Sequence, residues 1–393
     1  MADSTPGTMV PRRSFVEEGT RQRYELMELA GRLSGVIALG RGDPDLPTPP
    51  HVVMAGKQAI AQHGGTVSPL AGLPELRDTI AEKLKVENGI ELEGRDGIVV
   101  TTGGQEAVYL AVQALLRPGD EILVPDPRYT SYDVAIAMAG ARLALVPTNR
   151  DDGFQVHASD LERLVTPRTR AVLLISPGNP TAGVLTRQNL EEICDVVIKH
   201  NLMVISDEIY EKLLYDGARH VSVASLTGMA ERTVTVNGFS KTYCMTGWRL
   251  GYLAGPVPVM ERVQALKRIL SGPPPIISQY AGLAALRGPT AFLDDYLETY
   301  RQRRKVVLDG LDGLGFAYGP PMGAFYVFVD ASSIGRSAYD LSRSLLLDGK
   351  VLIFPGTAFG PRWTDYLRMS WLQPVSELEE ALERIRRVLR PSA

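Results

Sequence analysis

The sequence has few of the residues that build disulfide frameworks or metal centres. Its 393 residues include two cysteines, Cys194 and Cys244, and five histidines, without CxxC or other metal-ligand spacing. No stretch approaches the roughly 20 apolar residues of a membrane span, and the first residues lack the apolar run of a signal peptide. The formal net charge of −3 gives no indication of nucleic-acid or anionic-membrane binding. We therefore expect a cytoplasmic protein that binds no metal, nucleic acid or membrane.

The composition is that of a globular protein with a sizeable core. Hydrophobic residues make up 45% of the chain and charged residues 22%, and the length suits a large domain with a smaller one. The 27 prolines and 38 glycines are spread along the chain, which indicates many short connections rather than a disordered tract. The first dozen or so residues look like a flexible tail.

Short apolar runs alternate with helical patterns through the middle of the chain. Most runs are rich in Val, Ile and Leu and end at Pro, Gly, Asp or Ser, which is typical of buried parallel strands. Helical patterns between them include 105–116, 131–140 and 188–200. This alternation predicts an α/β fold with a mainly parallel sheet flanked by helices. The runs are 97–102, 121–125, 142–147, 171–176, 202–207, 233–238 and 251–256.

The C-terminal part predicts a smaller α/β domain. Strands and helices are expected in turn at 292–311 (helix), 324–330 (strand), 338–349 (helix), 351–354 and 367–371 (strands) and 377–389 (helix). Residues 13–35 also look helical and are expected to join this part. We expect three divisions: a tail and joining segment over 1–45, a large domain over 46–289 and a small domain over 290–393.

One lysine follows a predicted strand in an unusually apolar setting. Lys241 comes directly after the strand that ends at Gly238, and Phe239, Met245 and Trp248 lie close to it in the sequence. Partial desolvation lowers the pKa of a lysine and favours its neutral, nucleophilic amine. A lysine after a strand is more often solvated surface, so from its chemistry alone a surface role and a Schiff-base role both remain open.

The stretch 236–256 resembles the cofactor-lysine motif of the class I/II aminotransferases, which are fold type I pyridoxal-phosphate (PLP) enzymes. The family pattern is small-x-Ser-Lys followed by Gly-x-Arg-x-Gly. Here it reads Gly238-Phe239-Ser240-Lys241 and Gly247-Trp248-Arg249-Leu250-Gly251. Further motifs follow in family order over roughly residues 35–375. The resemblance implies a large PLP-binding domain with a smaller α/β domain, as in aspartate and aromatic aminotransferases.

Two further motifs carry residues for the cofactor ring. Asp207 ends an apolar strand in SDEIYE and can be a helix N-cap; the resemblance implies instead a carboxylate that keeps the pyridine nitrogen protonated. Tyr210 and Asn179, which are otherwise a packed aromatic and a turn residue, would then hydrogen-bond the phenolic oxygen. Ala182 stands where the family usually has glycine after Asn-Pro-Thr. By position, Tyr129 resembles the aromatic residue that stacks on the ring.

A glycine pair between strand and helix suggests a phosphate site. In TTGGQE, backbone N–H groups at the start of a helix can approach a phosphate, although most such pairs are tight turns. No GxGxxG fingerprint follows a strand, which argues against a dinucleotide. The resemblance implies that the cofactor contacts here are Gly103, Gly104, Gln105, Ser240 and Arg249.

Two residues resemble the family's contacts to the substrate α-carboxylate. Arg368, in YLRMSW, would grip it in a bidentate manner, although an arginine on a strand edge is usually solvated. Gly42 would face the same carboxylate through its backbone. A second carboxylate would need another cation; Arg128, Lys267 and Arg268 are candidates, and surface charge is the more ordinary explanation for each.

The resemblance implies an aminotransferase that works between an L-amino acid and a 2-oxo acid by a ping-pong mechanism. Lys241 would hold PLP as a Schiff base and act as the general base at Cα. The same residues would serve a carbon–sulfur β-lyase or another eliminase or decarboxylase. A non-catalytic PLP-binding regulator would need a DNA-binding domain, which the short N-terminal tail does not supply.

The chain departs from its family at two positions near the phosphate. Relatives usually have a tyrosine where this chain has Val67, and that tyrosine reaches the phosphate of the neighbouring subunit in a homodimer with shared active sites. Gly238 replaces a serine that some relatives use on the phosphate. Either Thr66 or Ser68 supplies the missing hydroxyl through a shifted alignment, or Arg249 and the backbone near Gly104 carry more of the phosphate charge.

Overall fold

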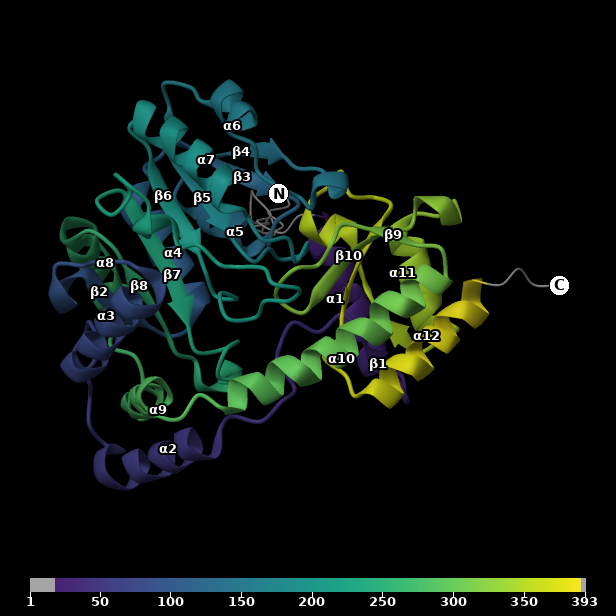
Figure 1. Cartoon of the computed structure of the whole chain (residues 1–393), viewed down its shortest axis with the longest axis horizontal. Helices are drawn as coiled ribbons and strands as arrows, with labels where there is room; N and C mark the ends of the chain where they lie inside the picture. Colours follow the sequence, from purple (N-terminus) through teal and green to yellow (C-terminus); the bar gives the residue numbers. More distant parts are fainter. Residues whose placement is uncertain (1–17, 390–393) are drawn as a thin grey trace, which may run out of the picture.

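A seven-stranded sheet forms the centre of the computed structural model, which describes residues 18–389 (Figure 1). The predicted tail of the first dozen residues lies outside this range. The mainly parallel sheet flanked by helices is confirmed, since every neighbouring pair that excludes β8 is parallel. In spatial order the strands are β2 (Ile98–Thr101), β8 (Gly251–Ala254), β7 (Thr233–Gly238), β6 (Met203–Asp207), β5 (Thr169–Ile175), β3 (Glu121–Asp126) and β4 (Arg142–Pro147).

Strand β8 is the exception to the parallel order, and the prediction of a parallel strand at 251–256 is wrong. It runs antiparallel to both β2 and β7. Parallel neighbours need a crossover of about a dozen residues or more, usually a helix. The segment 239–250 between β7 and β8 contains only the short 3-10 turn η4 (Thr246–Trp248), so the chain reverses direction there. This reversal leaves the predicted cofactor lysine on a loop at the carboxyl end of β7.

Helices cover both faces of the sheet because alternate strand residues point to opposite sides. Leu173 packs with α4 (Gly104–Leu115), α5 (Ser131–Met138) and α8 (Val257–Leu270), whereas Leu174 packs with α6 (Ala158–Leu164) and α7 (Arg187–Lys199). A third apolar cluster joins β2 and β8 to three more helices. These are α2 (Pro50–His63), α3 (Pro74–Asn88) and α9 (Ile276–Arg287).

The C-terminal part is built on a four-stranded antiparallel sheet. Its order is β12 (Phe354–Pro355), β13 (Tyr366–Ser370), β10 (Tyr326–Asp330) and β9 (Ala317–Tyr318). The helices here are α10 (Phe292–Gly313), α11 (Ala338–Leu347) and α12 (Val375–Leu389). Figure 1 shows α10 running from the vicinity of α9 to these C-terminal helices.

The N-terminal segment packs into this C-terminal part. Helix α1 (Glu18–Gly31) lies against the 3-10 turn η6 (Gly356–Phe359), and β1 (Ile37–Ala38) pairs in parallel with β11 (Val351–Leu352). The single strand expected at 351–354 is therefore two short strands, β11 and β12, in different sheets. The three predicted divisions of the chain remain a prediction.

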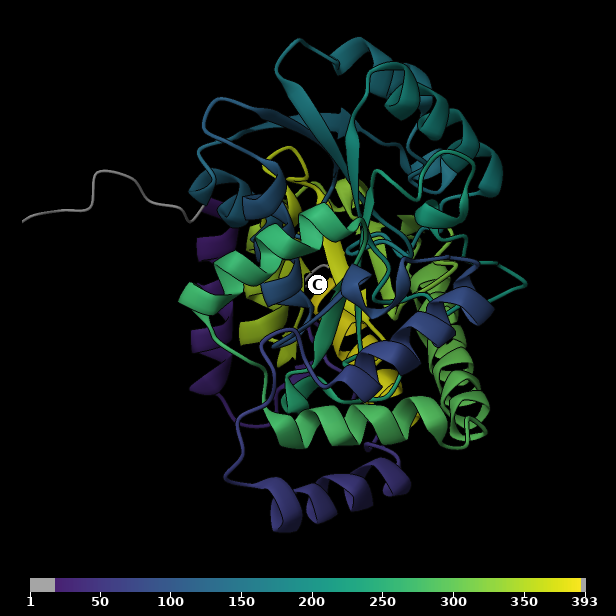
Figure 2. The same cartoon turned by 90° about the vertical axis from the view of Figure 1, so that its left-hand side faces the viewer.

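Helix α2 lies at the periphery of the molecule beside α9 (Figure 2). Two of its large apolar side chains, Met54 and Ile60, are exposed, and so is Val67 in the segment that follows. Between residues 18 and 389, no helix is long and apolar enough to cross a membrane.

Candidate active site

The predicted chemistry-bearing residues gather at the carboxyl ends of the central strands. Asn179 follows β5, Asp207 is the last residue of β6, and Lys241 lies in the loop after β7. Neighbouring parallel strands end at the same edge of a sheet, where open α/β sheets bind their ligands. Arg368, from β13 of the C-terminal part, reaches the same place and donates to Asn179 Oδ1 over 3.1 Å. The site therefore lies between the two sheets.

Lys241 is held in a largely buried pocket. Its Nζ donates to the carbonyl oxygen of Gly42 over 2.6 Å and lies 3.5 Å from Asp43 Oδ1. The rings of Tyr210 and Phe325 lie beside the ammonium, with centroids 6.0 and 5.7 Å away. Burial lowers the pKa of Lys241, although Asp43 opposes the effect. A lowered pKa increases the fraction of neutral amine, which is the form that attacks a carbonyl.

Asp207 is a buried carboxyl group with two hydrogen-bond donors. Tyr132, on α5, donates its phenolic hydrogen to Oδ2 over 2.8 Å, and the backbone N–H of Ile209 donates to Oδ1 over 3.2 Å. Burial raises the pKa of Asp207 to about 6, and the two hydrogen bonds oppose that rise. The carboxyl oxygens are thus fixed in orientation.

Tyr210 lies three residues after Asp207 and faces the C-terminal part. Its hydroxyl lies 3.1 Å from that of Tyr326, which also donates to the Gly42 carbonyl over 3.4 Å. Burial raises the pKa of Tyr210 well above its ordinary value, so the phenol keeps its proton. Lys241 and Tyr210 therefore share one polar network through Gly42 and Tyr326.

Arg368 is a buried cation with unused hydrogen-bonding capacity. Its Nη1 donates to Asn179 and its Nη2 to the Gly40 carbonyl over 2.6 Å, while its guanidinium lies over the Tyr326 ring. Nε is buried without a partner, and within residues 18–389 the side chain forms no ion pair with a carboxylate. Burial lowers the pKa of Arg368. An unpaired buried cation of this kind is a site for an anion.

The glycine pair forms a cradle beside a second arginine. Gly103 precedes α4 with φ 85°, a conformation that favours glycine. A Cβ added to Gly103 would come within 2.7 Å of Arg249 Nη2, and one added to Gly251 within 2.8 Å of the Gly104 nitrogen. The helix N-terminus and the guanidinium thus meet where only glycines leave room, which suits a phosphate.

Comparison with known proteins agrees with this geometry. The family model for aminotransferase class I and II matches residues 34–385. The chain belongs to this family. It is 39% identical over 368 residues to aromatic-amino-acid aminotransferase 2 of Thermococcus litoralis, covering 93% of this chain and 95% of the relative. It is 40% identical to the aspartate aminotransferase of Pyrococcus abyssi over the same shares.

Solved structures of family members have the same fold as this aminotransferase. The aromatic aminotransferase from Pyrococcus horikoshii superposes with a TM-score of 0.88 at 42% identity, covering 93% of this chain and 98% of that one. The aspartate aminotransferase from Rhizobium meliloti gives a TM-score of 0.91 at 34% identity, covering 98% and 99%. The predicted fold type and the expectation of an aminotransferase are confirmed.

The remaining predicted residues lie close by but make fewer contacts. Tyr129 packs edge-on against Tyr132, with ring centroids 5.6 Å apart. Ser240 is buried, and its carbonyl accepts a hydrogen bond from Thr246. Gln105 is exposed on the first turn of α4. Among the described residues, none of these three side chains hydrogen-bonds to the Lys241 network. Their role as cofactor contacts stays a prediction.

Two residues of the aminotransferase site were not predicted from the sequence. Tyr132 is the buried donor to Asp207, and Tyr326 links Tyr210 to Gly42. Tyr132 lies in the first turn of α5, three residues after Tyr129, and packs against its ring. Tyr326 sits in an apolar strand pattern that gave no separate signal.

Surface charge, the more ordinary explanation for the three candidate cations, is wrong for two of them. Arg128 is almost fully buried and pairs with Asp126 at 3.0 Å and Asp133 at 2.5 Å. Lys267 is also buried and binds both carboxylate oxygens of Glu106. Neither is surface charge, and each is neutralised by carboxylates of the chain. Arg268 is exposed on α8, as the surface explanation predicts.

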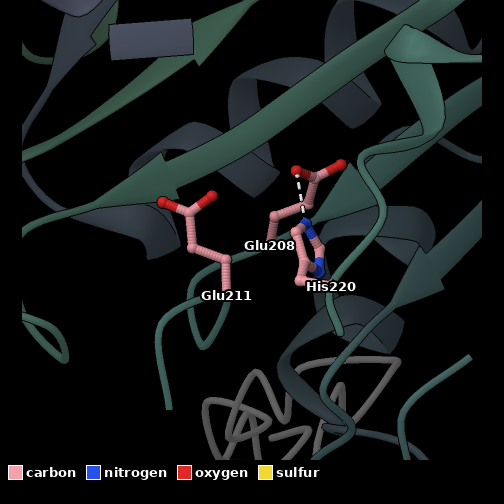
Figure 3. Close-up of side chains that lie close together, drawn as sticks. All are labelled: Glu208, Glu211 and His220. Carbon is pink, nitrogen blue, oxygen red and sulfur yellow. Dashed lines mark hydrogen bonds and ion pairs between the residues drawn. The ribbon is translucent and has the colours of Figure 1, made fainter. Parts of the chain in front are cut away.

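Directly after Asp207 in the sequence begins a second buried polar cluster, which contains Glu208, Glu211 and His220 (Figure 3). His220 Nε2 lies 3.0 Å from Glu208, which also accepts a hydrogen bond from Ser222 over 2.6 Å. Glu211 forms an ion pair with Lys83 of α3. These partners engage both carboxylates, so the cluster is an ion network that ties α3 to the end of β6.

Proposed function

We propose that this aminotransferase moves an amino group between an L-amino acid and a 2-oxo acid, with Lys241 as the residue that links PLP covalently. The observation that carries the proposal is the contact chain between Lys241 and Arg368. Lys241 binds the Gly42 carbonyl, Tyr326 binds the same carbonyl, and the Arg368 guanidinium lies over the Tyr326 ring. A nucleophilic amine and an unpaired carboxylate-binding cation are thereby held in one pocket.

The residues present suit the chemistry of PLP. The cradle at Gly103, which an added Cβ would fill, combines helix N–H groups with the Arg249 guanidinium, as a phosphate requires. The buried Asp207 carboxyl suits a basic ring nitrogen. Tyr210 and Asn179 offer a phenol and an amide to the ring's phenolic oxygen, and Tyr129, Ser240 and Gln105 are proposed as further contacts.

When bound, PLP supplies an electron-withdrawing ring that stabilises negative charge at the substrate Cα. Arg368 and the Gly42 backbone would hold the α-carboxylate, which fixes the Cα–H bond relative to Lys241. Lys241, with its lowered pKa, would take the Cα proton as a general base and later return a proton. Asp207 would hold a proton on the ring nitrogen, because a fixed anion stabilises the protonated form.

The test combines cofactor trapping with product analysis. The protein should bind PLP and turn yellow, and borohydride reduction should fix the label on the peptide that contains Lys241. A panel of amino donors should include aspartate and an aromatic amino acid, for which the relatives are named. Label on another lysine would remove Lys241 from its role. Release of pyruvate and ammonia without transfer to an oxo acid would indicate a lyase instead.

We also propose a homodimer with shared active sites, working in the cytoplasm. The exposed apolar side chains of Met54, Ile60 and Val67 on and after α2 support an interface with a second copy. Light scattering coupled to gel filtration would measure the assembly. A fully active monomer would exclude the shared site.

A further inference from the structure

A buried ion pair adjoins the cradle that is proposed for the cofactor phosphate. Lys267, on α8, is fully buried, and its Nζ lies 2.9 and 3.0 Å from the two carboxylate oxygens of Glu106. Glu106 lies in the first turn of α4, two residues after Gly104. The pair therefore joins α8 to the helix whose N-terminus forms part of the cradle.

Glu106 also holds the loop that leads into the cradle. Its Oε2 accepts a hydrogen bond from the backbone N–H of Thr102, and its Oε1 accepts one from the Ser271 hydroxyl. The Thr102 carbonyl in turn accepts from Arg249 Nη2 over 3.4 Å, and Gly103 follows Thr102 directly in the sequence. A change at Glu106 therefore reaches both the glycine backbone and the arginine of the cradle through one residue.

An ionised carboxylate at this position opposes the binding of a phosphate. Burial acts to raise the pKa of Glu106, but hydrogen bonds from Ser271, Thr102 and Lys267 outweigh it, and the pKa is lowered. A carboxylate in the first turn ordinarily stabilises its helix, because it interacts with the positive end of the helix dipole. A bound phosphate would use the same helix end. Two anions would therefore compete there unless one of them is neutralised.

Lys267 supplies that neutralisation from inside the protein. Its ammonium contacts both Glu106 oxygens and the Ser271 hydroxyl, and a buried charge of this kind is little screened by salt. Resting on the proposed function, we propose that Glu106 and Lys267 are a positioning pair for the cofactor phosphate. Glu106 fixes the loop at Thr102, and Lys267 cancels the negative charge that Glu106 brings to the cradle. Both residues act through the loop and the local charge rather than by contact with the cofactor.

The test compares PLP with pyridoxal, which lacks the phosphate. Each full-length protein is dialysed to equilibrium against a series of concentrations of either compound, and bound cofactor is measured by its absorbance. Lys267→Met should weaken PLP by about 10- to 100-fold and pyridoxal by less than about threefold, because an uncompensated carboxylate then repels the phosphate. Glu106→Gln should not weaken PLP, since glutamine keeps an acceptor for the Thr102 N–H and removes the negative charge. The double variant should bind PLP within about threefold of the wild type.

Lys83→Met is the matched control, because Lys83 is also a buried lysine paired with a glutamate, Glu211, but on α3. It should leave the ratio of the PLP and pyridoxal affinities unchanged. A purely structural ion pair predicts that Lys267→Met weakens PLP and pyridoxal equally, or that Glu106→Gln weakens PLP as much as Lys267→Met does. Either result, or a double variant that recovers no affinity, would overturn the proposal. The proposed function fails separately, if the wild type binds no PLP or converts no amino donor in the panel.

Discussion

Tyr132 of helix α5 donates a hydrogen bond to Asp207 at the end of strand β6. Helix α5 packs on one face of the central sheet, and the site lies at the edge of the same sheet. Both groups are buried, and the hydrogen bond of 2.8 Å stabilises the ionised carboxylate against the effect of burial. Tyr132 thus positions the residue that we propose for the cofactor nitrogen, without contacting the reacting atoms itself.

Replacing Tyr132 with phenylalanine should move the pH dependence of the enzyme. The pKa of Asp207, raised by burial to about 6, should rise further when a donor to its charged form is lost. Asp207 would then be protonated at higher pH, so the acid limb of kcat/KM should shift upward and activity near pH 6 should fall about three- to tenfold. Tyr109→Phe, on α4, is the control. An unchanged acid limb in Tyr132→Phe would exclude the positioning role.

Arg368→Lys should weaken amino-acid binding while PLP stays bound. A lysine keeps the charge but cannot donate to a carboxylate, Asn179 and Gly40 in the same geometry. The loss should be about 1.5–3 kcal/mol in the binding of the amino acid, measured by titration of the cofactor absorbance. Arg362→Lys, at a half-exposed ion pair with Asp126, is the control. Unchanged affinity in Arg368→Lys would remove this residue from the site.

The predicted elements show which physical signals the sequence carries. Buried strands such as β6 and β7 were placed to within a residue or two, because an apolar run that ends at a polar residue is a local signal. The direction of β8 was not predicted correctly. It depends on whether the preceding segment, 239–250, forms a helix, and the sequence of that segment has no strong hydrophobic periodicity. Strand order likewise depends on contacts between distant segments.

Within the site, too, residues marked by a local sequence signal were predicted, and residues whose role depends on tertiary packing were not. Lys241, Asp207 and Asn179 were found because each lies at the end of a strand or within four residues after it, in a recognisable motif. Arg128 and Lys267 were misjudged because a charged side chain gives no sign in the sequence that it will be buried together with a carboxylate, whether that carboxylate is near in the chain, as Asp126 is to Arg128, or distant, as Glu106 is from Lys267. Tyr132 lies on a helix, and its role depends on which helix face packs toward the pocket.

The His220 network predicts a specific pH dependence of stability. Burial alone would lower the pKa of His220, but Glu208 outweighs it and the pKa is raised. A raised folded-state pKa means that the protonated pair stabilises the fold at low pH and that this contribution is lost as pH rises through the folded pKa. Urea unfolding should therefore show that His220→Gln costs more stability at pH 6 than at pH 9. In a Glu208→Gln background that difference should disappear; a pH-independent cost would contradict the pairing.

The contacts around Val67 show which neighbouring hydroxyl could reach the cofactor phosphate of a second subunit. The Ser68 hydroxyl is buried, donates to the Pro274 carbonyl over 3.0 Å and accepts from Gln279 over 2.8 Å. It is therefore occupied within its own chain, whereas Val67 and Thr66 are exposed. Of the two hydroxyls that flank Val67, only that of Thr66 is available to a second copy.

Two substitutions separate the remaining explanations. If the alignment is shifted, Thr66→Val should speed PLP release on dialysis and Val67→Tyr should have no effect. If the hydroxyl is missing, Val67→Tyr should slow PLP release, because one new hydrogen bond to a charged group stabilises the bound cofactor by at most about 1.5–3 kcal/mol. Thr66→Val should then leave PLP release unchanged. Release is followed by the loss of cofactor absorbance. Because both outcomes need the segment to reach a partner's site, an active monomer whose PLP release neither variant alters would contradict both.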